Sequence, residues 1–324
     1  MRVAIVGATG ALGSEVLAAL DETRLPVSGL VPIATDRSLG TDVEFHGDVV
    51  AVETEIAALR GCDLAFLCAP PGASLDALRT ALHASVPAID CSGALAGNAE
   101  VPLVAELGVA GAPALDAPVL AIPPGIALAC ARVLGPLARE LGLARVVATL
   151  LESASSAGRA GVAALSDETI ALLSQQELAD PPALGHPVAF DVLPWSGEID
   201  DAGESSAERS FTATLGRALG GVAVAATILR TPVFCGDGAS LAIETRDPVA
   251  VARVVERLAK IEGVELGAPA PTTRAAAGSA LVHVGRIRRD PTSAQGLLLW
   301  LAADALHVTA AHALRVAEAR FARQ

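Results

Sequence analysis

Three glycines near the start of the chain have the spacing of a loop that can hold phosphate groups. They lie between an apolar run at residues 2–6 and residues 14–20, whose apolar side chains recur at helical spacing. Between a strand and a helix, such a loop lets backbone N–H groups approach a pyrophosphate, and the helix N-terminus adds partial positive charge. A tight turn that binds no ligand is the alternative. The candidate cofactor-binding residues of this loop are Gly7, Thr9, Gly10, Ala11, Leu12 and Gly13.

The residues after the second apolar run, at 27–33, bear on the choice of nucleotide. Asp36 could accept a hydrogen bond from a ribose hydroxyl, which favours NAD. Arg37 and Ser38 could instead hold the 2′-phosphate of NADP. Both nucleotides fit the pattern.

Cysteine and histidine form no recognisable catalytic or metal-binding pattern. The cysteines make no CxxC pair and no Cys/His cluster with zinc spacing, and their odd number argues against a closed disulfide framework. His307 and His312 are five residues apart, whereas ligands on one helix face are expected three or four apart. We therefore expect no metal site, histidines in surface or capping roles, and cysteines in the core. The five cysteines are Cys62, Cys68, Cys91, Cys130 and Cys235.

Alternating strand and helix patterns position the glycine loop. Apolar runs typical of buried parallel strands are followed by helical patterns, which indicates a doubly wound α/β domain. The expected strands cover residues 2–6, 27–33, 63–69 and 88–90, and the expected helices cover 14–20 and 74–84.

Strand patterns are more frequent in the second half of the chain, which predicts a second, mixed or antiparallel sheet. A helix at 126–141 precedes these strands. The acidic stretch 197–208 is expected to be an exposed loop or a loose helix start. The expected strands are 145–151, 188–193, 221–231, 238–244 and 279–287, and a long helix is expected at 297–321.

Size and charge narrow the class of protein. The 324 residues predict about two domains, and the net charge of −13 argues against a nucleic-acid or anionic-membrane partner. The apolar stretches are too short or too interrupted by proline to span a bilayer, and glycines interrupt the N-terminal run before any signal-peptide cleavage site. A cytoplasmic, reducing location is expected.

Motifs along almost the whole chain resemble those of the aspartate-semialdehyde dehydrogenase family. The resemblance implies an N-terminal Rossmann dinucleotide-binding domain at 1–125, an α+β dimerisation domain at 126–296, and a C-terminal helix at 297–324 that returns to the first domain. It also implies NADP as cofactor, with NAD as the alternative, and a homodimer. The matching stretches are IVGATGALG (5–13), DRSLG (36–40), IDCS (89–92), SSAGRAG (155–161), AFDVLP (189–194), RTPVF (230–234), VGRIRRD (284–290) and the segment from LW (299–300) to AE (317–318).

The resemblance also implies a chemistry for which this chain lacks the nucleophile. Members of the family attack an aldehyde with a cysteine, transfer hydride to the nicotinamide and release the thioester with phosphate. Their cysteine lies in an Asn-Pro-Asn-Cys turn at a helix start, where the matching residues here are Ile122-Pro123-Pro124-Gly125-Ile126. Glycine has no side chain to acylate. Cys130, five residues further, is expected to face another side of the helix.

Other functional positions of the family differ as well. The matching positions hold Glu152 instead of glutamine, Asp237 instead of the acid/base histidine, Ala96 instead of a phosphate-binding arginine and Glu204 instead of lysine. Arg230 and Glu208 match the substrate-binding residues. A structural pairing of Arg230 with Asp191 or Glu208 is the alternative to its binding a substrate carboxylate.

These differences predict an NAD(P)-binding member of a family of amino-acid biosynthesis that lacks standard dehydrogenase activity, a pseudoenzyme acting in binding, sensing or as a partner of an active homologue. Two alternatives remain. One is an oxidoreductase with altered chemistry, in which Glu152 or Asp237 donates a proton to a carbonyl. The other is an active aspartate-semialdehyde dehydrogenase whose nucleophile is a residue other than the one aligned at Gly125.

Overall fold

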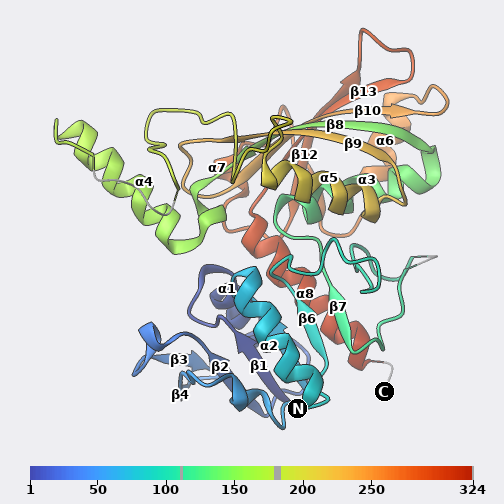
Figure 1. Cartoon of the computed structure of the whole chain (residues 1–324). Coiled ribbons are helices and arrows are strands. Elements are labelled where there is room, and N and C mark those ends of the chain that lie inside the picture. Colours follow the sequence, from blue (N-terminus) through green and yellow to red (C-terminus); the bar gives the residue numbers. More distant parts are fainter. Residues whose placement is uncertain (110–111, 179–183, 323–324) are drawn as a thin grey trace. The chain divides into compact units, whose positions relative to one another are not determined.

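The computed structural model describes residues 1–109, 112–178 and 184–322. The chain forms two compact units: Met1–Pro124 with Thr309–Gln324, and Gly125–Val308 (Figure 1). Among the described residues, none of the helices has both the length and the apolar character that crossing a bilayer requires.

The first unit is built on a parallel sheet. Its strands are β1 (Arg2–Val6), β2 (Gly29–Ile33), β5 (Leu64–Leu67), β6 (Ala88–Asp90) and β7 (Val119–Ala121), and its helices are α1 (Ala11–Asp21), α2 (Pro71–His83) and most of α8 (Ala305–Phe321), with short 3₁₀ turns η1 (Asp36–Ser38) and η2 (Ile56–Leu59). The strand order is β2-β1-β5-β6-β7.

Both faces of this sheet are buried. Val3 and Ile5 pack in one apolar cluster with residues of α1 and α8, and Ala4 and Val6 pack in another with residues of α2 and η2. Because helices cover both faces, the strands must be apolar throughout, which is the pattern in the sequence. The expected Rossmann-type domain is confirmed.

A small hairpin that the sequence analysis did not predict follows β2. Strands β3 (Asp42–Phe45) and β4 (Asp48–Ala51) pair antiparallel. His46 and Gly47 connect them, and both have positive φ angles, of 52° and 81°. Two such residues form the type of two-residue turn that matches the twist of a hairpin.

The second unit contains a mixed sheet with the strand order β11-β12-β13-β10-β8-β9, as expected from its strand patterns. Helix α3 packs on the central strands β8, β10 and β13, and α5 packs on the edge strand β9. The strands are β8 (Leu143–Glu152), β9 (Ala223–Arg230), β10 (Asp237–Thr245), β11 (Val264–Leu266), β12 (Val282–Arg289) and β13 (Gly296–Ala303); the helices are α3 (Ile126–Leu141), α4 (Gly158–Leu173), α5 (Ser206–Ala218), α6 (Val251–Leu258) and α7 (Thr273–Ala276), with a 3₁₀ turn η3 (Ala154–Ala157).

The strand expected at 188–193 is wrong. The backbone N–H groups of Val188 and Ala189 both donate to a carboxylate oxygen of Glu168, at 2.7 and 2.9 Å, instead of to a neighbouring strand. Phe190 has a positive φ of 62°. Leu193 alone makes a bridge, to Arg230. The segment therefore forms a turn, although its residues are mostly hydrophobic.

The helix expected at 297–321 begins only at Ala305, because the residues before it form β13. Asp304 separates the two elements: its carboxylate accepts hydrogen bonds from the N–H groups of Leu306 and His307 at 3.1 and 3.3 Å, as an N-cap residue does. Strand β13 pairs with β10 and β12. Residues 297–303 therefore belong to the sheet of the second unit, and the expected domain boundary after 296 is corrected accordingly.

Candidate functional site

The glycine loop has the backbone geometry that its sequence predicts. Gly7 has a φ of 86°, and its N–H and that of Ala8 both donate to the carbonyl oxygen of Ile33 at the end of β2. A Cβ atom at position 13 would lie 2.0 Å from the carbonyl oxygen of Gly7. Only glycine permits this approach of α1 to the strand.

Helix α1 presents its N-terminus at this loop. Gly10 is the N-cap residue, and the first helical hydrogen bond runs from Ser14 N–H to Gly10 O at 2.9 Å. The N–H groups of Ala11, Leu12 and Gly13 therefore have no acceptor within the helix. These donors and the helix dipole suit the pyrophosphate of a dinucleotide.

The turn after β2 lies against the same loop. Thr9 Oγ1 and Ser38 Oγ are 3.0 Å apart and share a hydrogen bond. Asp36 and Arg37, in the 3₁₀ turn η1, are exposed. The structure thus brings Thr9 and Ser38 together, and both the acid and the base that distinguish NAD from NADP remain accessible.

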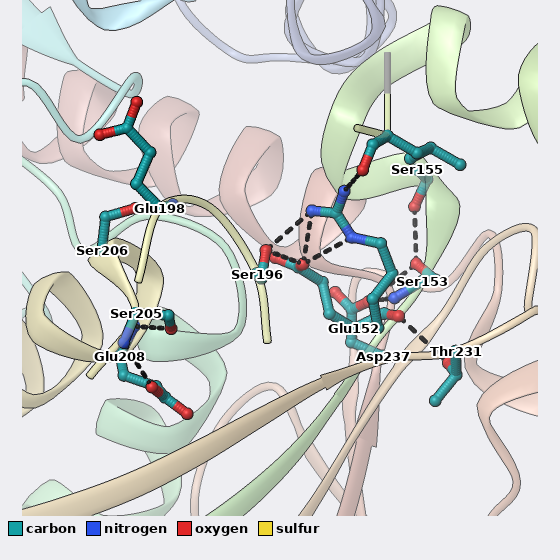
Figure 2. A network of polar contacts seen from close by, with 12 residues as sticks. Glu152, Ser153, Ser155, Ser196, Glu198, Ser205, Ser206, Glu208, Thr231 and Asp237 are labelled. Atoms are coloured by element: carbon teal, nitrogen blue, oxygen red, sulfur yellow. Dashed lines mark hydrogen bonds and ion pairs between the residues drawn. The ribbon is translucent and has the colours of Figure 1, made fainter. Parts of the chain in front are cut away.

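Arg230 and Glu152 form a half-buried ion pair in the second unit. They are partners in the register of the parallel strands β8 and β9, and their side chains are 12% and 22% exposed. Nη2 and Nε of Arg230 lie 2.9 and 3.3 Å from Glu152 Oε2. Ser196 Oγ donates to the same oxygen at 2.6 Å and accepts from Nη2 at 2.8 Å (Figure 2). The alternative of a structural ion pair therefore named the wrong partners: Arg230 pairs with Glu152 and not with Asp191 or Glu208.

A cavity of about 450 Å³ lies beside this ion pair. Arg230 is the one charged residue among those described that line it, and Ser196 contributes a hydroxyl. The other lining residues are alanine, leucine, tryptophan and glycine. The lining residues are Ala157, Leu184, Gly185, Leu193, Trp195, Ser196, Gly197 and Arg230.

Asp237 lies at the start of β10 in a buried network of hydroxyl groups. Its Oδ1 accepts hydrogen bonds from the N–H and Oγ of Ser153, at 2.8 and 2.7 Å, and Ser153 Oγ lies 2.9 Å from Ser155 Oγ (Figure 2). The pKa of Asp237 is raised to about 7, mainly by burial and also by the charges of Glu152 and Asp304, which together outweigh the lowering by the bonds from Ser153. Asp237 can therefore carry a proton at neutral pH.

Gly125 is the N-cap residue of α3, with φ of 55° and ψ of −137°. Positive φ strains any residue with a side chain. The position at a helix start is the one in which the resemblance places the family's cysteine.

Three of the five thiols are unsuited to nucleophilic attack. Cys130 is fully buried within α3, and burial raises its pKa to about 12. A hydrogen bond with Cys68, together with burial, raises the pKa of Cys91 well above its usual value. Burial also raises the pKa of Cys62. A protonated, buried thiol is a poor nucleophile. Cys68 and Cys235 are partly exposed.

Glu208 has the contacts of a helix cap. Its Oε2 accepts from the N–H of Ser205 at 2.7 Å, Ser205 Oγ accepts from Glu208 N–H at 3.3 Å, and its Oε1 accepts from the N–H of Ile228 at 2.9 Å. Burial raises its pKa, but these bonds outweigh that effect and lower it. Figure 2 shows Glu208 and Ser205 well apart from Glu152 and Asp237. The structure therefore joins Glu208 to α5 and β9 and not to the Arg230 network.

The other family positions also have local structural surroundings. Ala96 is buried in the turn after β6, next to Leu95, whose N–H donates to the carboxylate of Asp90 at 2.8 Å. The N–H of Glu204 donates to Asp200 Oδ1 at 3.0 Å in the loop before α5. Among the described residues no group of three or more His, Cys, Asp or Glu side chains could hold a metal ion.

Sequence reasoning missed the hydroxyl groups that organise this site. Ser153, Ser155 and Ser196 bind Asp237 and Glu152 directly or through one another. Ser153 and Ser155 follow Glu152 by one and three residues in the sequence and could have been noticed. Ser196 lies 44 residues from Glu152, and no local pattern marks it.

Comparisons with known proteins agree with this architecture. Residues 2–107 match the family described as "Semialdehyde dehydrogenase, NAD binding domain", and residues 134–308 match "Semialdehyde dehydrogenase, dimerisation domain". An aspartate-semialdehyde dehydrogenase of Streptomyces akiyoshiensis is 32% identical over 98% of both chains. A USG-1 protein homolog of Pseudomonas aeruginosa is 31% identical over 94% of this chain and 92% of its own.

A solved structure is similar over the full length. The crystal structure of aspartate semialdehyde dehydrogenase II from Vibrio cholerae, complexed with ASA, has a TM-score of 0.90 and 28% identity, and the match covers 100% of this chain and 98% of that one. With two domain matches in order and relatives that align from end to end, the chain belongs to the aspartate-semialdehyde dehydrogenase family.

Proposed function

We propose that this chain is an NAD(P)-binding member of its family that does not carry out acyl-enzyme dehydrogenation. The observation that carries the proposal is Gly125 at the N-cap of α3, the position at which the family resemblance places the nucleophilic cysteine. Without sulfur at this position no thiohemiacetal and no thioester can form there.

The neighbouring chemistry supports the proposal. The position of the family's histidine holds Asp237, whose Oδ1 already accepts two hydrogen bonds from Ser153. The position of its glutamine holds Glu152, whose carboxylate is paired with Arg230. Members of a catalytic unit act jointly, and loss of one costs several orders of magnitude in rate. Here the nucleophile and the base are both replaced.

The glycine loop supports nucleotide binding. The groups that would hold the pyrophosphate are the N–H groups of Ala11, Leu12 and Gly13 at the start of α1. We propose NADP as the nucleotide because Arg37 is exposed beside Ser38 and can pair with a 2′-phosphate. When bound, the nicotinamide would supply a hydride acceptor or donor. Arg37→Gln should weaken NADP binding by about tenfold or more and leave NAD binding within about twofold, as calorimetric titration would show.

We propose a homodimer whose interface is the face of the six-stranded sheet that α3 does not cover. On the face that α3 covers, side chains such as Leu150, Ala239 and Leu301 are buried. In the middle of the other face, alternate residues of β8, β9 and β10 are partly or fully exposed and uncharged, and Arg145 and Glu244 lie at its end. A patch of uncharged sheet residues of this kind suits a second copy of the chain. These residues are Val147, Thr149, Ala225, Thr227, Ser240 and Ala242. Thr149→Arg should convert the dimer to a monomer in sedimentation.

The central test combines turnover and covalent trapping. The pure protein is incubated with aspartate semialdehyde, phosphate and NADP, and the absorbance of the reduced nucleotide is followed. We expect no turnover, together with a rise in melting temperature on addition of the nucleotide alone. Mass spectrometry after substrate exposure should find no acyl group on any cysteine. A thioester on Cys235 or another cysteine would refute the proposal and favour a displaced nucleophile.

One observation favours a second candidate function, a hydride transfer without a covalent intermediate. Asp237 has a pKa of about 7 and can therefore donate a proton to a carbonyl oxygen at neutral pH. In this case NADPH would be consumed with a carbonyl substrate in the absence of phosphate, and Asp237→Asn would abolish the reaction.

A further inference from the structure

Arg230, which lines the cavity, is already paired with a carboxylate of the protein itself. Glu152 Oε2 receives three hydrogen bonds: two from the Arg230 guanidinium, at 2.9 and 3.3 Å, and one from Ser196 Oγ at 2.6 Å. Arg230 Nη2 also donates to Ser196 Oγ at 2.8 Å. The three side chains thus form a closed network, in which the positive charge that borders the cavity is neutralised (Figure 2).

The remaining hydrogen-bonding capacity of Arg230 is at Nη1. Within the described part of the chain, Nη1 contacts the carbonyl oxygen of Leu184, at the long distance of 3.5 Å. A ligand oxygen in the cavity could therefore accept from Nη1 while Glu152 keeps Nε and Nη2. A guanidinium has five N–H groups and can serve both acceptors.

A ligand carboxylate at this place would meet a like charge. It would approach Arg230 from the cavity while Glu152 occupies the other edge of the same guanidinium, and two carboxylates that share a site repel each other. No second cation among the described lining residues would offset this repulsion. To bind a carboxylate as a bidentate partner, Arg230 would have to leave Glu152, and a partly buried acid would then lose its partner.

We infer that the cavity beside Arg230 selects an uncharged ligand group with a hydrogen-bond-accepting oxygen, such as a carboxamide, and excludes carboxylates. The inference deepens the proposed function and rests on it. A site that excludes carboxylates would not bind aspartate semialdehyde, which carries one. Trp195, Leu193 and Leu184 supply apolar walls for the body of the ligand. Glu152 acts as the residue that determines specificity.

The test compares two small probes of similar size, malonamide and malonate, by calorimetric titration. We expect the wild-type chain to bind malonamide at least about tenfold more tightly than malonate. Glu152→Gln removes the negative charge but keeps the shape, and should reverse this preference by raising the affinity for malonate about tenfold or more.

Two controls accompany these titrations. The double variant Glu152→Gln with Arg230→Gln should lose the gained malonate binding, which assigns that binding to the guanidinium. Quenching of fluorescence by the bound probe should disappear in Trp195→Phe, which places the probe in the cavity. The wild-type titrations alone still decide the question if Glu152→Gln does not fold.

The inference is overturned if the wild-type chain binds malonate as tightly as malonamide, or if folded Glu152→Gln gains no malonate binding. These outcomes are distinct from failure of the proposed function. Turnover of aspartate semialdehyde would refute the proposed function, whereas malonate binding without turnover would refute the carboxylate exclusion alone.

Discussion

Replacing the buried acid at the start of β10 should change how stability depends on pH. In the folded chain the pKa of Asp237 is raised from 3.8 to about 7, first by burial and also by the charges of Glu152 and Asp304. Asp237→Asn keeps an oxygen that can accept both hydrogen bonds from Ser153 and removes the ionisation. The variant therefore isolates the titration of one carboxyl group.

The sign follows from proton binding. Between the unfolded and the folded pKa the folded chain holds a proton that the unfolded chain has lost, so the stabilising contribution of Asp237 is complete below the unfolded pKa and is lost as pH rises to the folded value. At about 1.4 kcal/mol per unit of difference in pKa, the free energy of unfolding falls by about 4 kcal/mol as pH rises from the unfolded to the folded pKa of Asp237. A rise from about pH 5.5 to about pH 8 removes about 2 kcal/mol of this stabilisation, because only the range below the folded pKa contributes.

Denaturant unfolding of the wild-type chain and of Asp237→Asn at these two pH values measures the effect. The stability of the variant relative to wild type should rise by about 2 kcal/mol from the lower to the higher pH, whatever the fixed cost of the substitution. Asp167→Asn, at an exposed position on α4, is the control and should show no such change. A difference between Asp237→Asn and wild type that stays constant with pH would refute the assigned burial and charge environment of Asp237.

Three further changes test the local structure. Gly13→Ala should destabilise the first unit by about 2 kcal/mol and weaken nucleotide binding, since its Cβ would overlap Gly7 O; wild-type stability in thermal unfolding would contradict the observed approach. Ser205→Ala should cost about 1 kcal/mol by removing the capping side chain of α5, and an unchanged denaturation midpoint would argue against the cap. Gly125→Cys should leave aspartate-semialdehyde turnover at background, because the positive φ strains the new side chain and no histidine occupies position 237; substantial activity would show that the nucleophile alone was missing.

The first unit could be predicted well from sequence because its strands carry a redundant signal. A strand buried on both faces must be apolar at every position, and the glycines at 7, 10 and 13 mark the turn that follows it. The short hairpin of β3 and β4 lacks this redundancy. Its strands are half exposed, and only the His46-Gly47 turn identifies them.

The end of the second unit shows why a continuous apolar run is ambiguous. Residues 297–303 are apolar at every position, so no period distinguishes a strand from the helix that follows. Pairing with β10 and β12 makes these residues a strand, and that pairing depends on residues distant in sequence. The cap at Asp304 was the local signal that could have separated β13 from α8.

The role of Glu208 could have been predicted from sequence, whereas the partner of Arg230 could not. Ser205 followed three residues later by Glu208 is the pattern of a capping box, and the structure forms it. The pairing of Arg230 with Glu152 follows from the parallel register of β8 and β9, across 78 residues of chain. Only the fold brings these two residues together.

Glu152 and Asp237, the two acids that differ from the family resemblance, each have partners of their own. A half-buried glutamate without a cation, or an arginine without an acid, would leave a costly unpaired charge. Here Glu152 pairs with Arg230 and Ser196 completes the network. Asp237 is buried, but its pKa of about 7 lets it remain neutral, and Ser153 supplies its hydrogen bonds. A site whose charges are matched in this way is a stable pocket, and Glu152 is the first residue to change when its ligand is sought.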